Sequence, residues 1–138
     1  MLKAKDIMTE DVLTVNRNAP LYDAIQMLVE HEITGLPVID DDGAMVGVIS
    51  EKDMLKELYD VDDKNGRVED FMTRVVTTFD HDDSVLEVCN CFIRSPFRRV
   101  PILDDGKVVG IISRADIINY ILRLKKSDTP QGAAAGGM

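Results

Sequence analysis

The sequence is poor in cysteine and in aromatic residues, and it contains no tryptophan. Its 138 residues include two cysteines, Cys89 and Cys91, which stand two positions apart in a stretch that we expect to be helical. Side chains two apart on a helix do not face each other, so the pattern predicts reduced thiols in a cytoplasmic protein rather than a disulfide. At this length a domain buries enough surface to fold without a disulfide or metal staple.

The sequence also lacks long apolar runs, and it has fewer basic than acidic residues. No apolar run approaches the ~20 residues that a bilayer-spanning helix needs, and the N-terminus lacks the apolar segment of a signal peptide. We therefore expect a soluble protein with no membrane insertion. The 16 Lys and Arg residues against 25 Asp and Glu give a net charge of -9. This charge repels the phosphate backbone of nucleic acids and argues against such a partner.

What the sequence does contain is an internal repeat. Residues 6–15, DIMTEDVLTV, align with residues 70–79, DFMTRVVTTF, and the register continues from residues 36–40 to 100–104 and from 46–50 to 109–113. A coincidence does not hold register over so many segments, so the pattern indicates a duplication. We expect repeat 1 at residues 1–60, a polar linker at 61–67, repeat 2 at 68–126 and a flexible tail at 127–138.

Hydrophobic patterning predicts the order β-α-β-β-α in each repeat, and hence a mixed α/β (α+β) fold. In repeat 1 we expect a strand at residues 12–15, a helix at 21–30, hairpin strands at 36–39 and 45–49, and a helix at 51–59. In repeat 2 the matching elements fall at residues 75–79, 85–94, 100–103, 108–112 and 114–124. Asn18 and Asp82 are the expected N-caps of the first helix in each repeat.

The last predicted helix carries more apolar surface than one buried face needs. One stripe is formed by Ile117, Ile118, Ile121 and Leu122, and further apolar side chains, Tyr120 and Leu124, lie off it. This arrangement implies burial on two sides. A partner surface and the first repeat of the same chain explain the second side equally well.

The repeated motifs resemble those of the cystathionine-β-synthase (CBS) domain. Each copy reads D-h-M-T, then h-P-h-h-D, D-G and G-h-h-S-x-x-D, where h is apolar, and the resemblance covers residues 2–125. It implies a stand-alone tandem CBS pair, with two repeats packed by pseudo-two-fold symmetry. It further implies a homodimeric regulatory sensor whose clefts bind AMP, ADP, ATP or S-adenosylmethionine and whose geometry signals occupancy to an unknown regulated protein.

The S-x-x-D segments suit this chemistry by themselves. Ser50 and Ser113 each end a strand and open a helix, and a helix N-terminus offers unpaired N–H groups to a phosphate. Asp53 and Asp116 can accept hydrogen bonds from both hydroxyls of a ribose. The same spacing also predicts a capping box, in which these side chains only satisfy the N–H groups of the helix.

The resemblance assigns residues to two sites, each built across both repeats. The site with the repeat-1 aspartate would contain Ser50, Lys52, Asp53, Met72, Thr77, Phe97, Arg98 and Arg99. The site with the repeat-2 aspartate would contain Ser113, Arg114, Asp116, Met8, Leu13, Ile33, Thr34 and Gly35. Arginine suits phosphate, so the first site favours a nucleotide, and the second favours a ligand with fewer phosphates or S-adenosylmethionine. Two adjacent arginines are otherwise simply solvated or paired with acidic neighbours.

The remaining polar clusters predict no chemistry of their own. Asp80, His81, Asp82 and Asp83 carry metal-ligand groups, but consecutive residues do not all point at one ion, so we expect no metal site. No activated nucleophile or acid–base pair is visible, so we expect neither an enzyme nor a catalytic cofactor. The alternative to a ligand sensor is a protein-interaction scaffold that binds no small molecule.

Overall fold

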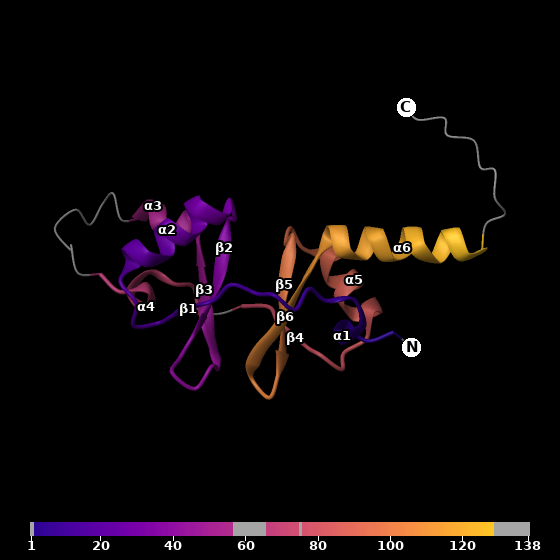
Figure 1. Ribbon diagram of the computed structural model, residues 1–138, viewed down its shortest axis with the longest axis horizontal. Coiled ribbons are helices and arrows are strands. Elements are labelled where there is room, and N and C mark those ends of the chain that lie inside the picture. Colours follow the sequence, from indigo (N-terminus) through magenta and orange to yellow (C-terminus); the bar gives the residue numbers. More distant parts are fainter. Residues whose placement is uncertain (1, 57–65, 75, 129–138) are drawn as a thin grey trace, which may run out of the picture.

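The computed structural model describes residues 2–56, 66–74 and 76–128, and its main feature is a pair of similar three-stranded sheets. The strand orders are β1-β2-β3 and β4-β5-β6. In each sheet the first strand pairs in parallel with the second, which pairs antiparallel with the third. Figure 1 shows the two sheets beside each other at the centre of the molecule, with the helices to either side. The predicted β-α-β-β-α duplication is confirmed.

The two halves contain matching elements. The first half has β1 (Val15–Asn16), α2 (Leu21–His31), β2 (Gly35–Ile39), β3 (Met45–Ser50) and α3 (Glu51–Leu55). The second half has β4 (Phe79–Asp80), α5 (Val85–Arg94), β5 (Arg99–Asp104), β6 (Lys107–Ser113) and α6 (Arg114–Asp128). Two further short helices, α1 (Ala4–Ile7) and α4 (Val68–Phe71), precede the first strand of each half.

Both predicted hairpins form, and glycine closes each of them. Gly43 and Gly106 have φ values of +85° and +78°, a left-handed conformation that glycine adopts at little cost. Asp105 precedes Gly106 and also has a positive φ, of 52°. Two consecutive residues with positive φ make the tight turn that matches the twist of the paired strands.

The first strand of each half is shorter than predicted, because the residues before it cross to the other half. Thr9 forms two backbone hydrogen bonds with Ile111 in β6, and Thr73 forms two with Val48 in β3. Strand structure begins only at Val15 and Phe79, near the ends of the predicted runs at residues 12–15 and 75–79. Residue 75 lies outside the described residues.

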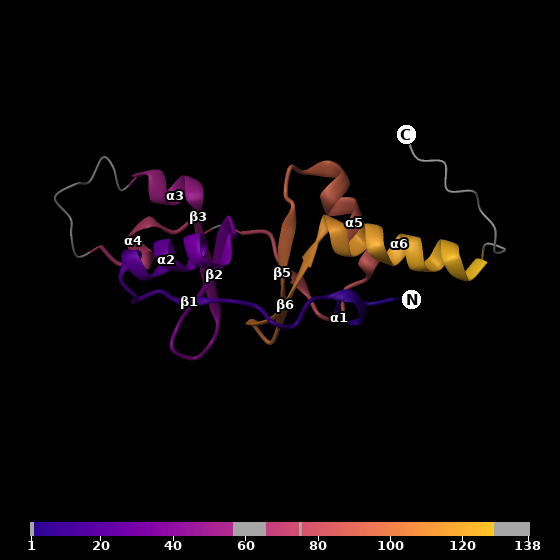
Figure 2. The same cartoon turned by 45° about the horizontal axis from the view of Figure 1, so that its top comes forward.

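The crossing exchanges a segment between the two hydrophobic cores. Val68, Phe71 and Met72 are buried in the core of the first sheet, whereas Ala4 is buried in the core of the second. Figures 1 and 2 both show α1 in the half that contains β4–β6, and α4 in the half that contains β1–β3. Each repeat therefore completes its core with the leading segment of the other.

Gly47 and Gly110 permit this crossing. A β-carbon at position 47 would stand 2.6 Å from the carbonyl oxygen of Thr73, which is closer than atoms approach without a shift. A β-carbon at position 110 would meet the side chain of Met8. The glycine of the repeated G-h-h-S motif is thus required by the backbone or side chain that passes over it.

The predicted N-caps were wrong. Helix α2 follows Pro20, which makes no side-chain capping bond, and α5 is capped by Ser84, whose Oγ accepts from the Leu86 N–H. Asn18 and Asp82 instead lie in turns, where their N–H groups donate to the side chains of Asn16 and Asp80. Asn and Asp stabilise such turns by this two-residue bond, which competes with capping.

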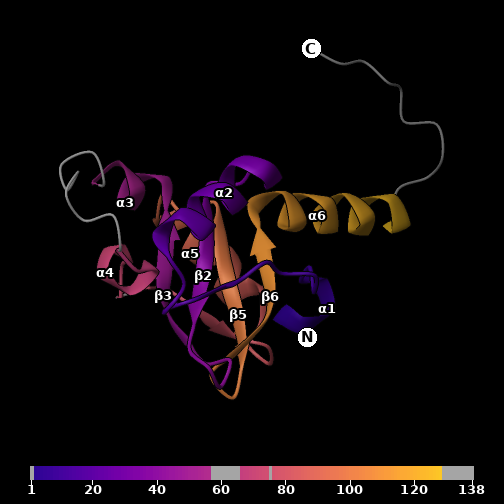
Figure 3. The same cartoon turned by 60° about the vertical axis from the view of Figure 1, so that its left-hand side comes forward.

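The described ends of the second helices differ from the predicted ends at 59 and 124. Helix α3 ends at Leu55, and residues 57–59 and most of the predicted linker at 61–67 lie outside the described residues. Helix α6 continues to Asp128, into the segment predicted as tail, whose residues 129–138 also lie outside the description. Figure 3 shows α6 leading away from the sheets. Along it, Ile118, Ile121, Leu122 and Leu124 are exposed, so the first repeat does not cover them.

Candidate functional site: two clefts between the repeats

Both S-x-x-D segments form capping boxes at strand-to-helix junctions. At α3, the Ser50 N–H donates to Asp53 Oδ2 at 3.0 Å, and the Asp53 N–H donates back to Ser50 Oγ at 3.4 Å. At α6, the Ser113 N–H donates to Asp116 Oδ2 at 2.8 Å, and the Asp116 N–H donates to Ser113 Oγ at 3.1 Å. The capping prediction is therefore confirmed in both repeats, and each box occupies only one carboxylate oxygen of its aspartate.

The other carboxylate oxygen distinguishes the two aspartates. Asp53 is 4% exposed, and its Oδ1 accepts a hydrogen bond from Thr73 Oγ1 at 3.1 Å and lies 3.7 Å from the Lys56 ammonium group. Asp116 is half-buried, and its Oδ1 has no hydrogen-bond partner among the described residues. Both oxygens of Asp53 are thus satisfied within the protein, whereas Asp116 retains a free acceptor.

Asp116 lines a cleft of about 300 Å³ between the repeats, which we call the Asp116 cleft. Its lining is mostly apolar, and its polar side chains come from three separate segments of the chain. The lining residues are Thr9, Asp11, Val12, Leu13, Ile33, Gly35, Leu36, Pro37, Arg99, Ile111, Ser113 and Asp116. This volume lies at the lower end of the range of ligand pockets, and such a wall with a few polar groups is typical of a small-molecule site.

A second cleft of about 330 Å³ lies beside the first and contains Ser50, so we call it the Ser50 cleft. It carries two arginines and no carboxylate among its lining residues. These are Thr34, Gly35, Leu36, Pro37, Val48, Ser50, Pro96, Phe97, Arg98, Arg99, Pro101 and Ile111. Asp53 is not one of them, because it is buried behind Ser50 and held by Thr73.

The two clefts share one wall. Gly35 and Arg99 line both of them, together with Leu36, Pro37 and Ile111. Gly35 and Arg99 are equivalent positions in the repeat alignment, one residue before the pair that ends in proline. Gly35 has no side chain, whereas Arg99 has a long one, whose Nη1 lies 3.5 Å from Thr34 Oγ1.

The clefts contain only part of each expected residue set. The Asp116 cleft contains Ser113, Asp116, Leu13, Ile33 and Gly35 from its predicted set, and the Ser50 cleft contains Ser50, Phe97, Arg98 and Arg99. Thr34 lines the Ser50 cleft instead of the Asp116 cleft. Lys52 and Thr77 are exposed and line neither cleft.

Two methionines and one arginine from the predicted sites point elsewhere. Met8 and Met72 pack against Gly110 and Gly47 in the two cores. Arg114 donates to the carbonyl oxygens of Phe92, Ser95 and Phe97 at distances of 2.7–3.1 Å. The last carbonyls of a helix lack partners within that helix, so Arg114 closes the C-terminal end of α5 rather than facing a ligand.

Sequence reasoning missed several residues of the Asp116 cleft, and it missed Thr73, which closes off Asp53. The missed lining residues are Thr9, Asp11, Val12, Leu36, Pro37 and Ile111. Thr9 and Thr73 are the threonines of the repeated D-h-M-T motif, so the repetition itself was the available signal. Their partners are distant in sequence, and no local pattern identifies them.

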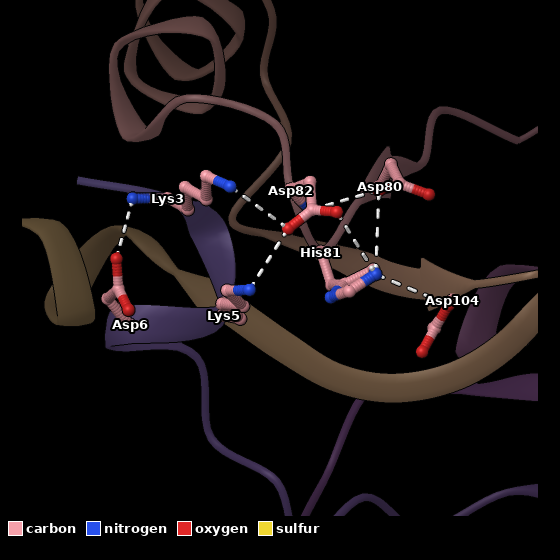
Figure 4. A network of polar contacts seen from close by, with 7 residues as sticks. All are labelled: Lys3, Lys5, Asp6, Asp80, His81, Asp82 and Asp104. Atoms are coloured by element: carbon pink, nitrogen blue, oxygen red, sulfur yellow. Dashed lines mark hydrogen bonds and ion pairs between the residues drawn. The ribbon is translucent and has the colours of Figure 1, made fainter. Parts of the chain in front are cut away.

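A polar network links α1 to the turn after β4, as Figure 4 shows. Asp82 Oδ1 lies 3.1 Å from the Lys5 ammonium group and 3.4 Å from that of Lys3. His81 Nε2 lies 3.5 Å from Asp82 and 3.2 Å from Asp104. The Lys5 hydrogen bond holds the pKa of Asp82 below its usual range, desolvation opposes this effect, and Lys3 and His81 reinforce it.

This network contains the residues that could be taken for a metal site. One ligand atom from each of Asp80, His81 and Asp82 lies within 4.8 Å of the others. Both lysines, however, approach Asp82 Oδ1, and cations compete with a metal ion for such an oxygen. The geometry supports an ion-pair network that fastens α1 to the second repeat.

Comparisons with known proteins identify the class to which this architecture belongs. Residues 4–60 and 68–123 each match the CBS domain, so the chain belongs to the CBS domain family and carries two copies in tandem. The chain is 31% identical over 117 residues to the protein MJ1225 of Methanocaldococcus jannaschii. The aligned region covers 85% of this chain and 42% of MJ1225. The chain thus spans less than half the length of that relative.

Solved structures share the fold and include ligand complexes. A crystal structure of CBSX2 in complex with AMP has a TM-score of 0.78 and 32% identity, and covers 91% of this chain and 99% of that one. The CBS domain pair of protein MJ0100, in complex with 5'-methylthioadenosine and S-adenosyl-L-methionine, has a TM-score of 0.72 and 32% identity, and covers 91% and 99%. Both similar proteins therefore bind adenosine-containing ligands.

None of the described helices combines the length and the apolar character needed to cross a lipid bilayer.

Proposed function

We propose that this chain is a regulatory module that binds an adenosine-containing ligand, such as AMP or S-adenosylmethionine, in the Asp116 cleft. The single observation that carries the proposal is that Asp116 lines a cleft between the repeats while its Oδ1 has no hydrogen-bond partner among the described residues. An ionised carboxylate with an unused oxygen can accept hydrogen bonds from ribose hydroxyls. Similar CBS pairs in complex with AMP and S-adenosylmethionine support the same ligand class.

The other lining groups of the cleft provide complementary contacts. Val12, Leu13 and Ile33 form an apolar wall against which an adenine ring packs. Ser113 lies at the N-terminal end of α6, a helix of 15 residues whose dipole attracts an anion. Arg99 adds a guanidinium group suited to a phosphate.

Acidic groups in this cleft limit the charge of its ligand. Asp11 and Asp116 both line it, and Arg99 is the one cation among the residues described there. Like charges repel strongly at short range, so each additional phosphate weakens binding. We therefore expect AMP and S-adenosylmethionine to bind the Asp116 cleft more tightly than ATP does.

The Ser50 cleft has the opposite charge and a different selectivity. Its described lining residues include Arg98 and Arg99 and no carboxylate, and Asp53 is closed off by Thr73. We propose that this cleft accepts the phosphate part of a nucleotide without a carboxylate contact to the ribose. The sealed Asp53 is also the observation that favours the alternative function, a scaffold whose S-x-x-D segments serve only as helix caps.

A calorimetric titration tests the proposal against this alternative. AMP, ADP, ATP, S-adenosylmethionine and GTP are each titrated into the full chain, and thermal unfolding is followed in parallel. A ligand that binds only the folded state stabilises it by ~2.7 kcal/mol at a hundred times its Kd. Binding of AMP or S-adenosylmethionine that is lost in Asp116→Ala supports the ligand sensor. No heat and no thermal shift at millimolar concentrations supports the scaffold.

We further propose that occupancy is transmitted through a homodimer. Exposed apolar residues occur at equivalent positions of the two repeats, and they pair as Tyr22 with Leu86, Val29 with Ile93, and Leu55 with Ile118. Such a duplicated apolar surface is typical of an association surface rather than of scattered exposure. A second copy of the chain would cover the α2–α3 and α5–α6 faces, and ligand binding between the repeats would alter the spacing of these faces. Occupancy shifts this equilibrium only by its differential affinity for the two arrangements.

A further inference from the structure

The two clefts meet at a single arginine, and this inference rests on the proposed function because it concerns how two bound ligands affect each other. Arg99 lines both the Asp116 cleft and the Ser50 cleft. Its counterpart in the other repeat is Gly35, which also lines both clefts but has no side chain to place in either. The pseudo-symmetry of the repeats is therefore broken where the two clefts join.

Arg99 has no strong partner that would fix it in one cleft. It is exposed, and its only described side-chain hydrogen bond is a 3.5 Å approach to the hydroxyl of Thr34, at the outer limit for such a bond. No ion pair holds it in the described part of the chain. Rotation about the side-chain bonds can thus bring its guanidinium group into either cleft at little cost.

The charges of the two clefts make Arg99 important to both. In the Asp116 cleft it is the one cation, opposite Asp11 and Asp116. In the Ser50 cleft it stands beside Arg98, and two guanidinium groups bind a phosphate better than one. A ligand phosphate that captures Arg99 in one cleft removes it from the other.

We propose that Arg99 couples the two clefts, so that binding of one AMP weakens the binding of a second AMP to the same chain. The coupling depends on the phosphate of AMP, because adenosine has no phosphate that would bind the guanidinium group of Arg99. It is also reciprocal, since each ligand must lower the affinity for the other by the same factor. The chain then responds to AMP in two steps spread over a wide concentration range.

The test separates the clefts with two blocking substitutions. Leu13→Trp fills the Asp116 cleft and Pro96→Trp fills the Ser50 cleft, because each residue lines only one of them and is exposed. Thermal unfolding verifies that each variant is folded, and Leu13→Phe and Pro96→Leu provide smaller replacements. AMP and adenosine are titrated calorimetrically into the native chain and into each blocked variant, with and without Arg99→Ala.

Each blocked variant should bind one AMP. Arg99→Ala should lower the affinity for that AMP by about tenfold in both blocked variants. Adenosine binding should not depend on Arg99. In the native chain, the second AMP should bind about tenfold more weakly than it binds to the matching blocked variant. Arg98→Ala is the matched control, because it should lower the affinity for AMP only in proteins whose Ser50 cleft is not blocked.

Three results overturn the coupling: an Arg99→Ala effect in one background only, a second AMP as tight in the native chain as in the blocked variant, or two AMP molecules bound to a blocked variant. Failure of the proposed function looks different, because the native chain would then bind neither AMP nor S-adenosylmethionine, whereas binding of S-adenosylmethionine without AMP would overturn the coupling alone.

Discussion

Thr73 and Asp53 are 20 positions apart in the sequence, and a 3.1 Å hydrogen bond from the Thr73 hydroxyl to Asp53 Oδ1 joins the leading segment of one repeat to the helix cap of the other. The equivalent threonine, Thr9, has no described bond to Asp116 and lines the open cleft instead. The hydrogen bond from Thr73 therefore distinguishes Asp53, whose Oδ1 is occupied within the protein, from Asp116, whose Oδ1 is free among the described residues.

Replacing this threonine should reduce stability. Thr73→Val keeps the side-chain shape but removes the donor to a buried carboxylate, so we expect a loss of about 1–3 kcal/mol in the free energy of unfolding. Urea denaturation measures it. Thr9→Val is the matched control and should change stability by less than about 0.5 kcal/mol. Equal losses in the two variants would contradict the asymmetry.

The two aspartates should respond differently to alanine substitution. Asp116→Ala removes a cap, at about 0.5–2 kcal/mol, and should abolish ligand binding in the Asp116 cleft. Asp53→Ala also leaves the Thr73 hydroxyl without its partner and should cost more stability, while the Asp116 cleft still binds. Calorimetric titration and thermal unfolding of both variants measure the two effects. If folded Asp116→Ala still bound the ligand, the Asp116 carboxylate would not be part of the binding site.

The two repeated glycines should tolerate alanine unequally. Gly47→Ala places a methyl group against the backbone oxygen of Thr73, which moves only with the main chain, so we expect a loss of about 1–3 kcal/mol. Gly110→Ala meets the side chain of Met8, which is flexible and can change rotamer. The loss should therefore be smaller at position 110, as chemical denaturation of both variants would reveal.

Acid should loosen α1 from the second repeat. The pKa of Asp82 is lowered in the folded state, so the ion pairs with Lys5 and Lys3 stabilise the fold fully above the unfolded pKa of about 3.9. This stability is lost as the pH falls from there through the lower folded pKa. Denaturation at a series of pH values measures it, with Asp82→Asn as the comparison. The native chain should lose more stability than this variant below about pH 4, and parallel curves would exclude the effect.

A charge on the exposed apolar face should dissociate the proposed homodimer. Ile93 is 76% exposed and Ile118 is 63% exposed, so Ile93→Asp and Ile118→Asp leave the cores intact. Light scattering at micromolar concentration should give the mass of two chains for the native protein and of one chain for the double variant. Glu87→Asp, at an exposed polar position on α5, should leave the mass unchanged. A native mass of one chain would refute the homodimer.

The sequence predicted the features that arise from local patterns. The two hairpins were predicted because D-G turns and apolar alternation lie within a few residues of each other, and the capping boxes because Ser and Asp are three positions apart. The resemblance placed Arg114 at a ligand site, whereas its guanidinium group donates to carbonyl oxygens at the end of α5. Local sequence could not show these contacts, because the carbonyls lie 17 or more positions earlier.

The difference between the clefts could not be predicted, because the two S-x-x-D motifs are alike in sequence. Asp53 is closed off by the hydroxyl of Thr73, whereas Thr9 has no described bond to Asp116, and this contact joins segments that are 20 positions apart in the sequence. The sharing of Arg99 likewise depends on the distance between two hairpins from different repeats.

The exchange of leading segments determines the order in which the chain can fold during its synthesis. The first sheet emerges from the ribosome before Val68, Phe71 and Met72, which complete its core, so it must wait for them with apolar side chains uncovered. Helix α1 is made before β6 and α6, against which it packs, so it finds its place only after both have emerged. A truncated product that ends at the linker would therefore contain neither finished core, and the two repeats reach their native state together.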